Sequence, residues 1–216
     1  MRKESAKRLQ LLLQHDRRFL TQGFVSLAGV DEAGRGPLAG PVVASAVVVR
    51  DFSFSCRIDD SKRMTPPARE KAYREILDRG RVGVAVVGHE TIDRINIYQA
   101  TLLAMREAVL KLPEMPDGVL VDGPKVPALE TKRFAIVNGD ALSLSIACAS
   151  IVAKVVRDRL MQEYDALYPA YGFKKHKGYG TREHLEALRR HGPCEIHRKS
   201  FKPVKMSLLR YARNDQ

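Results

Sequence analysis

The sequence contains no tryptophan, and aromatic residues of all kinds make up only 6% of it. Its three cysteines, Cys56, Cys148 and Cys194, form no C-x-x-C pair, which argues against a disulfide framework and against a cysteine zinc site. No apolar stretch approaches the roughly 18 residues of a membrane span, and the N-terminus lacks the apolar core of a signal peptide. We therefore expect reduced thiols and a cytoplasmic protein with no membrane contact.

Acidic residues are outnumbered by basic ones. Lys and Arg together number 37 against 25 Asp and Glu, so the formal net charge is +12. Such an excess favours a polyanionic partner, usually nucleic acid, although a basic protein without one is the alternative. At 216 residues and 44% hydrophobic residues, the chain is long enough for one large domain or two small ones.

Apolar patterns predict the secondary structure. β-Branched or buried runs predict strands at residues 25–30, 42–49, 82–87, 118–121 and 134–137. Helical spacing predicts helices at residues 1–22, 66–78, 97–112 and 144–167. Three strands followed by alternating helices and strands favour an α/β fold with a central mixed five-stranded sheet flanked by helices.

The chain divides into three parts in this interpretation. Residues 1–22 form a basic, helical N-terminal extension, to which we assign no chemistry. Residues 23–190 form the catalytic domain, and residues 191–216 form a basic, helical C-terminal segment packed on that domain.

Two adjacent carboxylates, Asp31 and Glu32, follow an apolar run and precede a glycine loop. Adjacent residues of a regular strand point to opposite faces, so both carboxylates can serve one site only if the strand ends between them. The glycines predict that ending. Two further acids, Asp122 and Asp140, also stand where an apolar segment meets a glycine or a helix start.

Segment ends of this sort cluster at one edge of an α/β sheet, so the four acids could share a pocket. Unneutralised carboxylates there would repel one another and raise their own pKa values, so the pocket needs cations. Oxygen ligands select Mg²⁺ or Mn²⁺ over Zn²⁺, and two such ions can catalyse phosphodiester hydrolysis. A structural alternative exists for each single acid: Asp140 could be a helix N-cap, and Asp122-Gly123 an ordinary turn pair.

The glycine loop reads G-x-G-x-x-x-G through Gly34, Gly36 and Gly40, which does not match the G-x-G-x-x-G of a dinucleotide fold. Its glycines allow backbone groups to approach a sugar hydroxyl or a phosphate closely. Basic and aromatic residues alternate at 171–184, which suits a nucleic-acid backbone with a stacked sugar or base. Within it we favour a substrate contact for Tyr179, whereas Phe173 fits a contact and the core equally well.

Several ordered motifs resemble those of ribonuclease HII from about Leu27 to Val204. They read GVDEAGRGPLAGPVV, DSK, NIYQATLLAM, LVDG, GD followed by SIVAKVVRD, HKGYGT and HRKSFKPV. The resemblance implies a ribonuclease H-like fold and metal-dependent endonucleolytic cleavage of the RNA strand of RNA–DNA hybrids. It also implies incision on the 5′ side of single ribonucleotides in duplex DNA, leaving 3′-hydroxyl and 5′-phosphate ends.

The same resemblance implies roles for individual residues. Asp31, Glu32, Asp122 and Asp140 would be catalytic and would bind Mn²⁺ or Mg²⁺, with two ions present when substrate is bound. Five further residues would contact the substrate: Gly34, Arg35, Gly36, Lys62 and Tyr179. Of these, Gly34, Arg35 and Gly36 would read the ribose 2′-hydroxyl through backbone groups. Asp158 matches a family position with at most a supporting role.

Two positions depart from the family pattern: Pro124 stands where many relatives have Asn, and Asn138 where they have Lys. Ribonuclease HIII shares the catalytic motifs but carries a large extra N-terminal domain, which the segment before Leu27 is too short to supply. We expect a monomer whose substrates are RNA–DNA hybrids and ribonucleotide-containing duplexes. The alternatives are a non-catalytic hybrid-binding module and a nuclease of the same fold acting on DNA junctions.

Overall fold

The computed structural model describes residues 2–214 of the chain, and the side chains of residues 4–209. The first residue of the predicted N-terminal extension and the last two of the basic C-terminal segment lie outside the described residues. Within the described part, no helix is long and apolar enough to cross a membrane.

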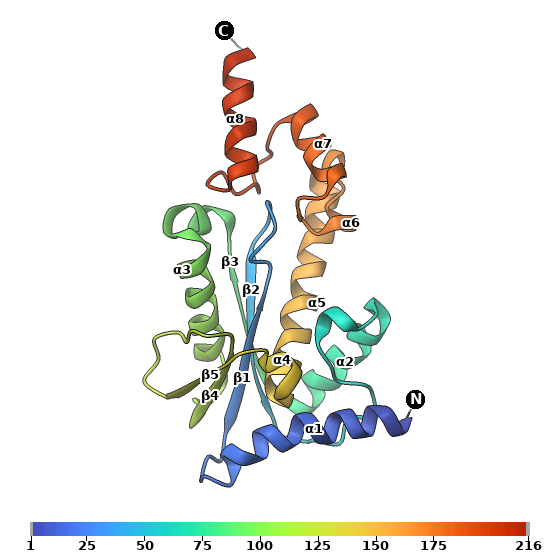
Figure 1. Cartoon of the computed structure of the whole chain (residues 1–216), viewed down its shortest axis with the longest axis vertical. Coiled ribbons are helices and arrows are strands. Elements are labelled where there is room, and N and C mark those ends of the chain that lie inside the picture. Colours follow the sequence, from blue (N-terminus) through green and yellow to red (C-terminus); the bar gives the residue numbers. More distant parts are fainter. Residues whose placement is uncertain (1, 215–216) are drawn as a thin grey trace. The chain divides into compact units, whose positions relative to one another are not determined.

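One sheet organises the fold, in the strand order β3-β2-β1-β4-β5 (Figure 1). Strand β1 is antiparallel to β2 and parallel to β4, and β4 is parallel to β5. The predicted mixed five-stranded sheet is therefore confirmed. The strands are β1 (Leu27–Ala33), β2 (Val42–Val49), β3 (Gly80–Val87), β4 (Gly118–Asp122) and β5 (Lys132–Ile136).

Helices account for much of the remaining chain. They are α1 (Arg2–Leu20), α2 (Pro66–Arg79), α3 (His89–Leu110), α4 (Gly139–Leu142), α5 (Leu144–Leu167), α6 (Phe173–His176), α7 (Arg182–His191) and α8 (Lys202–Asn214). Short 3₁₀ turns cover Ser61–Arg63 and Pro169–Tyr171.

Local chemistry explains several of these boundaries. Helix α2 begins after Thr65, whose side chain accepts a hydrogen bond from the Ala68 amide, and its first residues are prolines. Helix α3 starts earlier than predicted, but its regular course is broken at Asn96, where φ is +67°. The predicted start at residue 97 is therefore the start of its second helical stretch. The predicted bounds of α5 are confirmed.

The start of α5 packs unusually close to β1. A β-carbon built at Gly29 would lie 2.0 Å from the carbonyl carbon of Ser145 and 2.2 Å from the amide nitrogen of Ile146. Both atoms belong to backbone, so neither can move aside cheaply. Glycine at position 29 is therefore what allows the helix to lie against the strand that carries Asp31.

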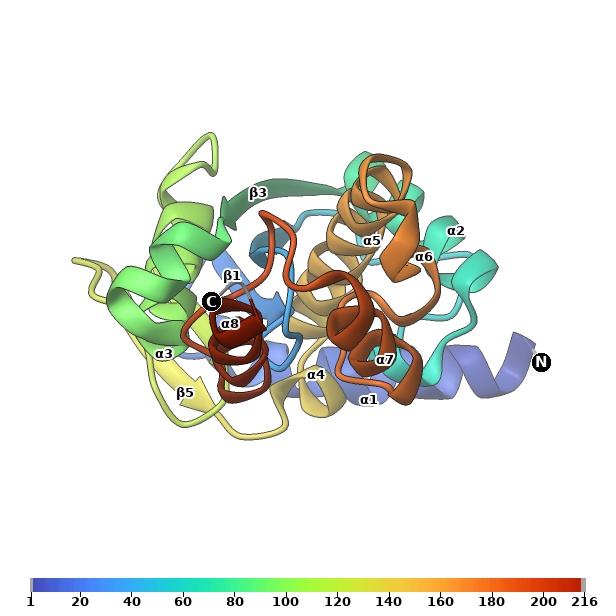
Figure 2. The same cartoon turned by 90° about the horizontal axis from the view of Figure 1, so that it is seen from above.

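The chain forms two compact units, and each consists of several chain segments. The first contains the residues up to Ala33 together with Val43–Ala85 and Leu102–Val155; the second contains Gly34–Val42, Val86–Thr101 and the residues from Val156 onward. Within the first unit, α1 lies beside α4 (Figure 1 and Figure 2). The predicted division at residues 22 and 190 stays a prediction.

Candidate active site

Strand β1 continues past both candidate carboxylates. Its residues pair with β2 as far as Ala33, with Asp31 opposite Ser45 and Glu32 opposite Ala44. Pairing with β4 on the other side stops at Val30. The prediction that the strand ends between the two acids is therefore wrong, because β1 keeps pairing with β2 after its pairing with β4 has stopped.

Asp31 is buried, with 5% of its surface exposed. Its Oδ1 accepts a hydrogen bond of 2.7 Å from the Glu32 amide, and the Ser150 hydroxyl also bonds to it. Val30 pairs with Val121, so Asp31 is level with Asp122 on the neighbouring parallel strand and points to the same face. Burial, then the charges of Glu32 and Asp122, raises the pKa of Asp31 well above its ordinary value.

Asp122 connects two acids that are far apart in sequence. It is the last residue of β4, and its Oδ1 accepts a hydrogen bond of 2.6 Å from the Gly139 amide at the start of α4. Asp140 is the next residue of that helix. Burial, followed by the charges of Asp122 and Asp60, raises the pKa of Asp140. The charge of Asp122 thus acts on both Asp31 and Asp140.

Asp140 does not cap a helix. The start of α5 is capped by Ser143, whose hydroxyl accepts from the Ile146 amide at 3.3 Å. The residue before α4 is Asn138, which has a left-handed backbone with φ of +57°. The N-cap interpretation of Asp140 is therefore wrong. Asn is among the residues that tolerate this conformation best, which gives a physical reason for Asn at position 138.

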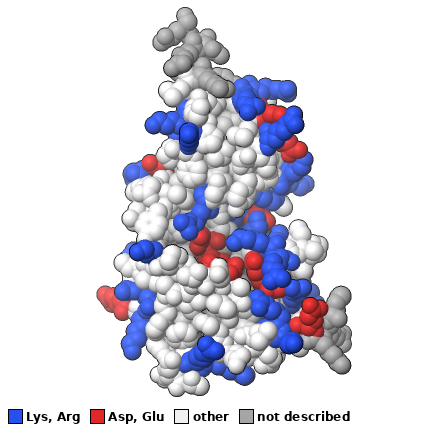
Figure 3. Space-filling model, viewed as in Figure 1, with Lys and Arg blue, Asp and Glu red and all other residues white. Residues whose placement is uncertain are grey.

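Lys62 and Ser61 lie beside the acids. The Ser61 and Ser150 hydroxyls share a hydrogen bond of 2.9 Å, so Ser150 links the DSK segment to Asp31. Burial opposes protonation of Lys62, but nearby carboxylates raise its pKa, and these are Asp31, Asp140, Asp60 and Asp122. A group of acidic side chains also gathers among Lys and Arg on the face in Figure 3.

The donor set suits a hard cation, since the candidate ligands are all carboxylates. Among the described residues, no three His, Cys, Asp or Glu side chains lie close enough together to hold a metal ion. The charges of Glu32 and Asp122 thus raise the pKa of Asp31, and the charge of Asp122 raises that of Asp140, but the four acids are not gathered around one point. A divalent cation that drew them together would relieve their repulsion.

In the second unit, two buried arginines hold the glycine loop. Arg157, with 1% of its surface exposed, donates to the carbonyl oxygens of Pro41 at 3.0 Å, Lys177 at 3.0 Å and Ala39 at 3.3 Å. Gly34 has φ of +98°, and a β-carbon there would lie 2.0 Å from the Arg157 Nε. Any other residue at position 34 would therefore strain the backbone and displace this guanidinium.

Arg198 is fully buried and contacts the same loop. Its guanidinium donates to four loop carbonyls: Gly34 at 2.6 Å, Pro37 at 2.8 Å, Arg35 at 2.9 Å and Gly40 at 2.9 Å. The sequence interpretation assigned no role to Arg157 or Arg198. Arg157 stands four residues after Ala153 and four before Met161, both buried, and an arginine on this apolar face of α5 was the available signal.

Tyr179 and Phe173 have different environments. Tyr179 is 45% exposed, and a β-carbon at Gly36 would lie 3.5 Å from its ring, so the ring adjoins the glycine loop. Phe173 is fully buried and stacks on Tyr171 with ring centroids 5.3 Å apart. Of the two interpretations of Phe173, the core is confirmed, and Tyr179 remains available to a ligand.

Three histidines of the second unit, His176, His184 and His197, form a buried cluster. His184 and His197 approach through their Nε2 atoms at 3.0 Å, and His176 stacks on His184 with ring centroids 4.5 Å apart. His184 Nδ1 also bonds to the Tyr179 carbonyl oxygen at 2.9 Å. His191 is exposed. The cluster therefore supports the segment that presents Tyr179.

We expect this pair to make the protein acid-sensitive. Burial lowers the pKa of both His184 and His197 to about 4. Their folded pKa values lie below the ordinary value of 6.5, so their stabilising contribution is complete above pH 6.5 and is lost as pH falls through about 4. Between pH 6.5 and about 4, the melting temperature should fall less steeply in His197→Gln than in the unmodified protein. His191→Gln should leave this slope unchanged. Equal pH slopes in all three proteins would contradict this expectation.

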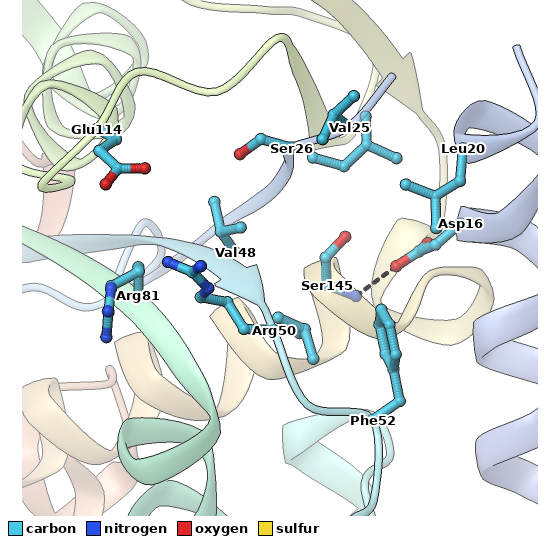
Figure 4. Close-up of a pocket in the computed structure, with 12 residues that line it drawn as sticks. Asp16, Leu20, Val25, Ser26, Val48, Arg50, Phe52, Arg81, Glu114 and Ser145 are labelled. Atoms are coloured by element: carbon cyan, nitrogen blue, oxygen red, sulfur yellow. Dashed lines mark hydrogen bonds between the residues drawn. The ribbon is translucent and has the colours of Figure 1, made fainter. Parts of the chain in front are cut away.

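A surface pocket of about 370 Å³ lies elsewhere in the first unit, near α1 (Figure 4). Its walls include Asp16, Val48, Arg50, Arg81 and Ser145, and no candidate site residue lines it. The candidate active site is therefore distinct from this pocket.

Comparison with known proteins agrees with this geometry. A family profile described as Ribonuclease HII matches residues 28–204. The chain is 50% identical over 196 residues to the ribonuclease HII of Ruminiclostridium cellulolyticum, covering 90% of this chain and 77% of the relative. It is 52% identical over 183 residues to that of Caldicellulosiruptor saccharolyticus, covering 84% of this chain and 89% of the relative.

Solved structures share the fold. The crystal structure of ribonuclease H2 from Pyrococcus horikoshii OT3 superposes with a TM-score of 0.74 at 26% identity, covering 88% of this chain and all of the other. A ribonuclease HIII structure in complex with Mn²⁺ has a TM-score of 0.67 at 19% identity, covering 87% of this chain and 70% of the other. With the profile match and the half-identical relatives, these likenesses show that the chain belongs to the ribonuclease HII family and is an endoribonuclease acting on nucleic acid.

Proposed function

We propose that this protein cleaves the RNA strand of RNA–DNA hybrids and nicks duplex DNA on the 5′ side of single embedded ribonucleotides. The products would be 3′-hydroxyl and 5′-phosphate ends. The observation that carries the proposal is that Asp122 is level with Asp31 and accepts a hydrogen bond from the Gly139 amide beside Asp140, so three carboxylates lie together. A polyanion can approach such a group only when cations neutralise it. The net charge of +12 would attract the same polyanion.

Asp31, Glu32, Asp122 and Asp140 would hold Mg²⁺ or Mn²⁺, with two ions present when substrate is bound. When bound, such a pair supplies an activated water and stabilises the leaving oxygen of an in-line displacement. The protein's own contribution is to hold the carboxylates in place, through the amide of Gly139 on Asp122 and the Ser150 hydroxyl on Asp31. Lys62, beside these acids, would contact the substrate backbone.

The ribose 2′-hydroxyl would be read by backbone groups of Gly34, Arg35 and Gly36. This hydroxyl is what distinguishes RNA from DNA, and Gly34 stands only two residues after Glu32 in the chain. Arg198 supports this role because it holds the carbonyls of Gly34 and Arg35 in one arrangement. Tyr179, exposed beside Gly36, would pack against the sugar at the RNA–DNA junction.

A cleavage assay on matched duplexes tests the proposal. One duplex carries a single ribonucleotide, a second is all DNA and a third is an RNA–DNA hybrid, each with Mg²⁺, Mn²⁺ or EDTA. We expect a metal-dependent nick 5′ of the ribonucleotide and no cut in the all-DNA duplex. Binding without cleavage in either metal would support a hybrid-binding module, and cleavage of DNA junctions would support a junction nuclease.

Tyr179→Ala should weaken binding of the single-ribonucleotide duplex because the sugar loses its contact with the ring, and the loss should not exceed the about 1–3 kcal/mol that a base stacked on an aromatic ring contributes. Tyr179→Phe keeps the ring and is the matched control. Affinity is best measured in EDTA, where the duplex stays intact. Equal affinities for the alanine variant and the unmodified protein would remove Tyr179 from the substrate site.

A further inference from the structure

The N-terminal helix α1 lies outside the residues that the family profile matches, yet it belongs to the compact unit that carries the four acids. Leu12 and Leu13 are buried, so the helix is part of the packed unit rather than a solvated appendage. Figure 1 and Figure 2 both show α1 beside α4, the short helix that contains Asp140.

One side chain of α1 joins two segments of the candidate site. Arg8 Nε donates to Asp59 Oδ1 at 2.9 Å, and Arg8 Nη2 donates to the Ala141 carbonyl oxygen at 3.0 Å. Ala141 directly follows Asp140, and Asp59 stands three residues before Lys62. A single guanidinium therefore ties the segment of a proposed metal ligand to the segment of a proposed substrate contact.

The Asp59 end of this link is firmly held. Asp59 has 1% of its surface exposed, and Arg57 also bonds to its carboxylate. Although burial opposes the change, hydrogen bonds from Arg57, the Asp60 amide and Arg8 lower the pKa of Asp59. The carboxylate is therefore ionised at neutral pH and accepts charge-assisted hydrogen bonds, which are stronger than neutral ones.

The Ala141 end needs such support. Helix α4 has four residues, Gly139–Leu142, and a helix this short does not persist without tertiary contacts. The Gly139 amide bonds to Asp122 at one end, and Arg8 binds the Ala141 carbonyl at the other. The only charged residue in α4, Asp140, thus lies between two tertiary hydrogen bonds.

A second residue of α1 holds the next segment. Asp16 is buried, and its Oδ2 accepts a hydrogen bond of 2.8 Å from the Ser145 amide in the first turn of α5 (Figure 4). Arg8 and Asp16 are eight residues apart, about 12 Å along an α-helix. Arg8 bonds to Ala141, before the junction between α4 and α5, and Asp16 bonds to Ser145, after it.

We propose that α1 is a positioning element of the active site, in which Arg8 sets the place of Asp140 relative to the Asp60–Lys62 segment. This inference rests on the proposed metal-binding role of Asp140. A displacement of about 1 Å at a catalytic group can cost roughly 10²-fold in rate, so a link of this kind has a measurable effect. Arg8 acts through Asp140 and Lys62 and does not itself touch the substrate.

The test compares Arg8→Ala with Arg8→Lys and with Arg18→Ala, which removes an exposed arginine of the same helix. Two measurements are independent of activity: amide hydrogen exchange at residues 139–146, and calorimetric titration of the free protein with Mn²⁺. Kinetic measurements then give kcat and KM on the single-ribonucleotide duplex. All three measurements are made well below the melting temperature of each variant, so that a general loss of stability does not change the results.

For Arg8→Ala we expect faster exchange at residues 139–146 and Mn²⁺ binding weakened about tenfold, the lower end of the range for residues that support metal ligands. The kcat at limiting metal should fall, with KM largely unchanged. Arg8→Lys should recover part of the loss, because one ammonium can reach Asp59 or Ala141 but not both in the same way. Arg18→Ala should behave as the unmodified protein.

The inference would be overturned if Arg8→Ala had the same hydrogen exchange at residues 139–146 and the same Mn²⁺ affinity as the unmodified protein. This holds even if the melting temperature of Arg8→Ala were lower. Failure of the proposed function has a different signature. In that case the unmodified protein would leave every ribonucleotide-containing duplex uncut, whatever Arg8 does to exchange and metal binding.

Discussion

Asp31→Asn and Asp140→Asn should each abolish metal-dependent nicking at a single ribonucleotide while the duplex still binds. An amide is a weaker ligand than a carboxylate and leaves a bound cation less neutralised. If this withdraws about 4 kcal/mol of transition-state stabilisation, the rate falls about 10³-fold. Single-turnover cleavage in Mg²⁺ measures the rate, and binding in EDTA measures the affinity.

Although Asp31→Asn should abolish nicking, it should stabilise the folded protein in EDTA. Burial raises the pKa of Asp31 in the folded protein. A raised folded pKa means that stability is fully present below the unfolded value, about 3.9, and is lost as pH rises through the folded value. At pH 8 the unmodified protein therefore bears this cost, and Asp31→Asn should melt at a higher temperature. An inactive but more stable variant separates a site defect from misfolding.

Asp78→Asn is the matched control, since Asp78 is an exposed acid on α2. It should change neither nicking nor the melting temperature. Unchanged nicking in both Asp31→Asn and Asp140→Asn would remove the carboxylates from the reaction. Lost nicking with equally lost binding would point to a damaged substrate surface.

Arg198→Gln should both destabilise the protein and weaken recognition of the ribonucleotide. The guanidinium is fully buried and donates to four carbonyls of the glycine loop. Hydrogen bonds to charged groups are strong, and a buried carbonyl left without its donor costs about 1–3 kcal/mol. The midpoint of urea unfolding measures this loss.

Recognition is measured separately, as the affinity for the single-ribonucleotide duplex relative to the all-DNA duplex, in EDTA and without urea. Arg198→Lys keeps the charge but offers one donor group, so most of the discrimination should still be lost. Arg190→Gln, an exposed arginine of α7, is the control. If Arg198→Lys unfolds earlier yet keeps full discrimination, Arg198 serves the fold and not the loop's reading of the 2′-hydroxyl.

Local sequence patterns predicted most of the fold correctly. β-Branched runs identify β1, β2 and β3, and short apolar runs identify β4 and β5. Helical spacing identifies α2 and α5 close to their observed ends. These features depend on short-range periodicity, on Thr65 and two prolines at a helix start, and on Gly80 at its end. The family motifs located the four acids and Tyr179 as well.

Other features depended on contacts between distant parts of the chain. The length of β1 beyond Asp31 was mispredicted because its pairing with β2, and not the glycines after it, decides where it ends. The burial of Phe173 depends on Tyr171 and the histidine cluster around it. No periodicity within one segment encodes such partners.

The sequence by itself determined where the five strands and the longer helices lie, the family, and which acids are candidates for the site, because these follow from periodicity and from motifs that are contiguous in the chain. Only the tertiary structure decided which backbone carbonyls the buried Arg157 and Arg198 hold, and that Arg8 of α1 reaches both Asp59 and Ala141. The physical reason is the length of the arginine side chain. A guanidinium bonds whatever carbonyl or carboxylate the fold brings within its reach, and partners up to 164 residues away in sequence leave no local pattern.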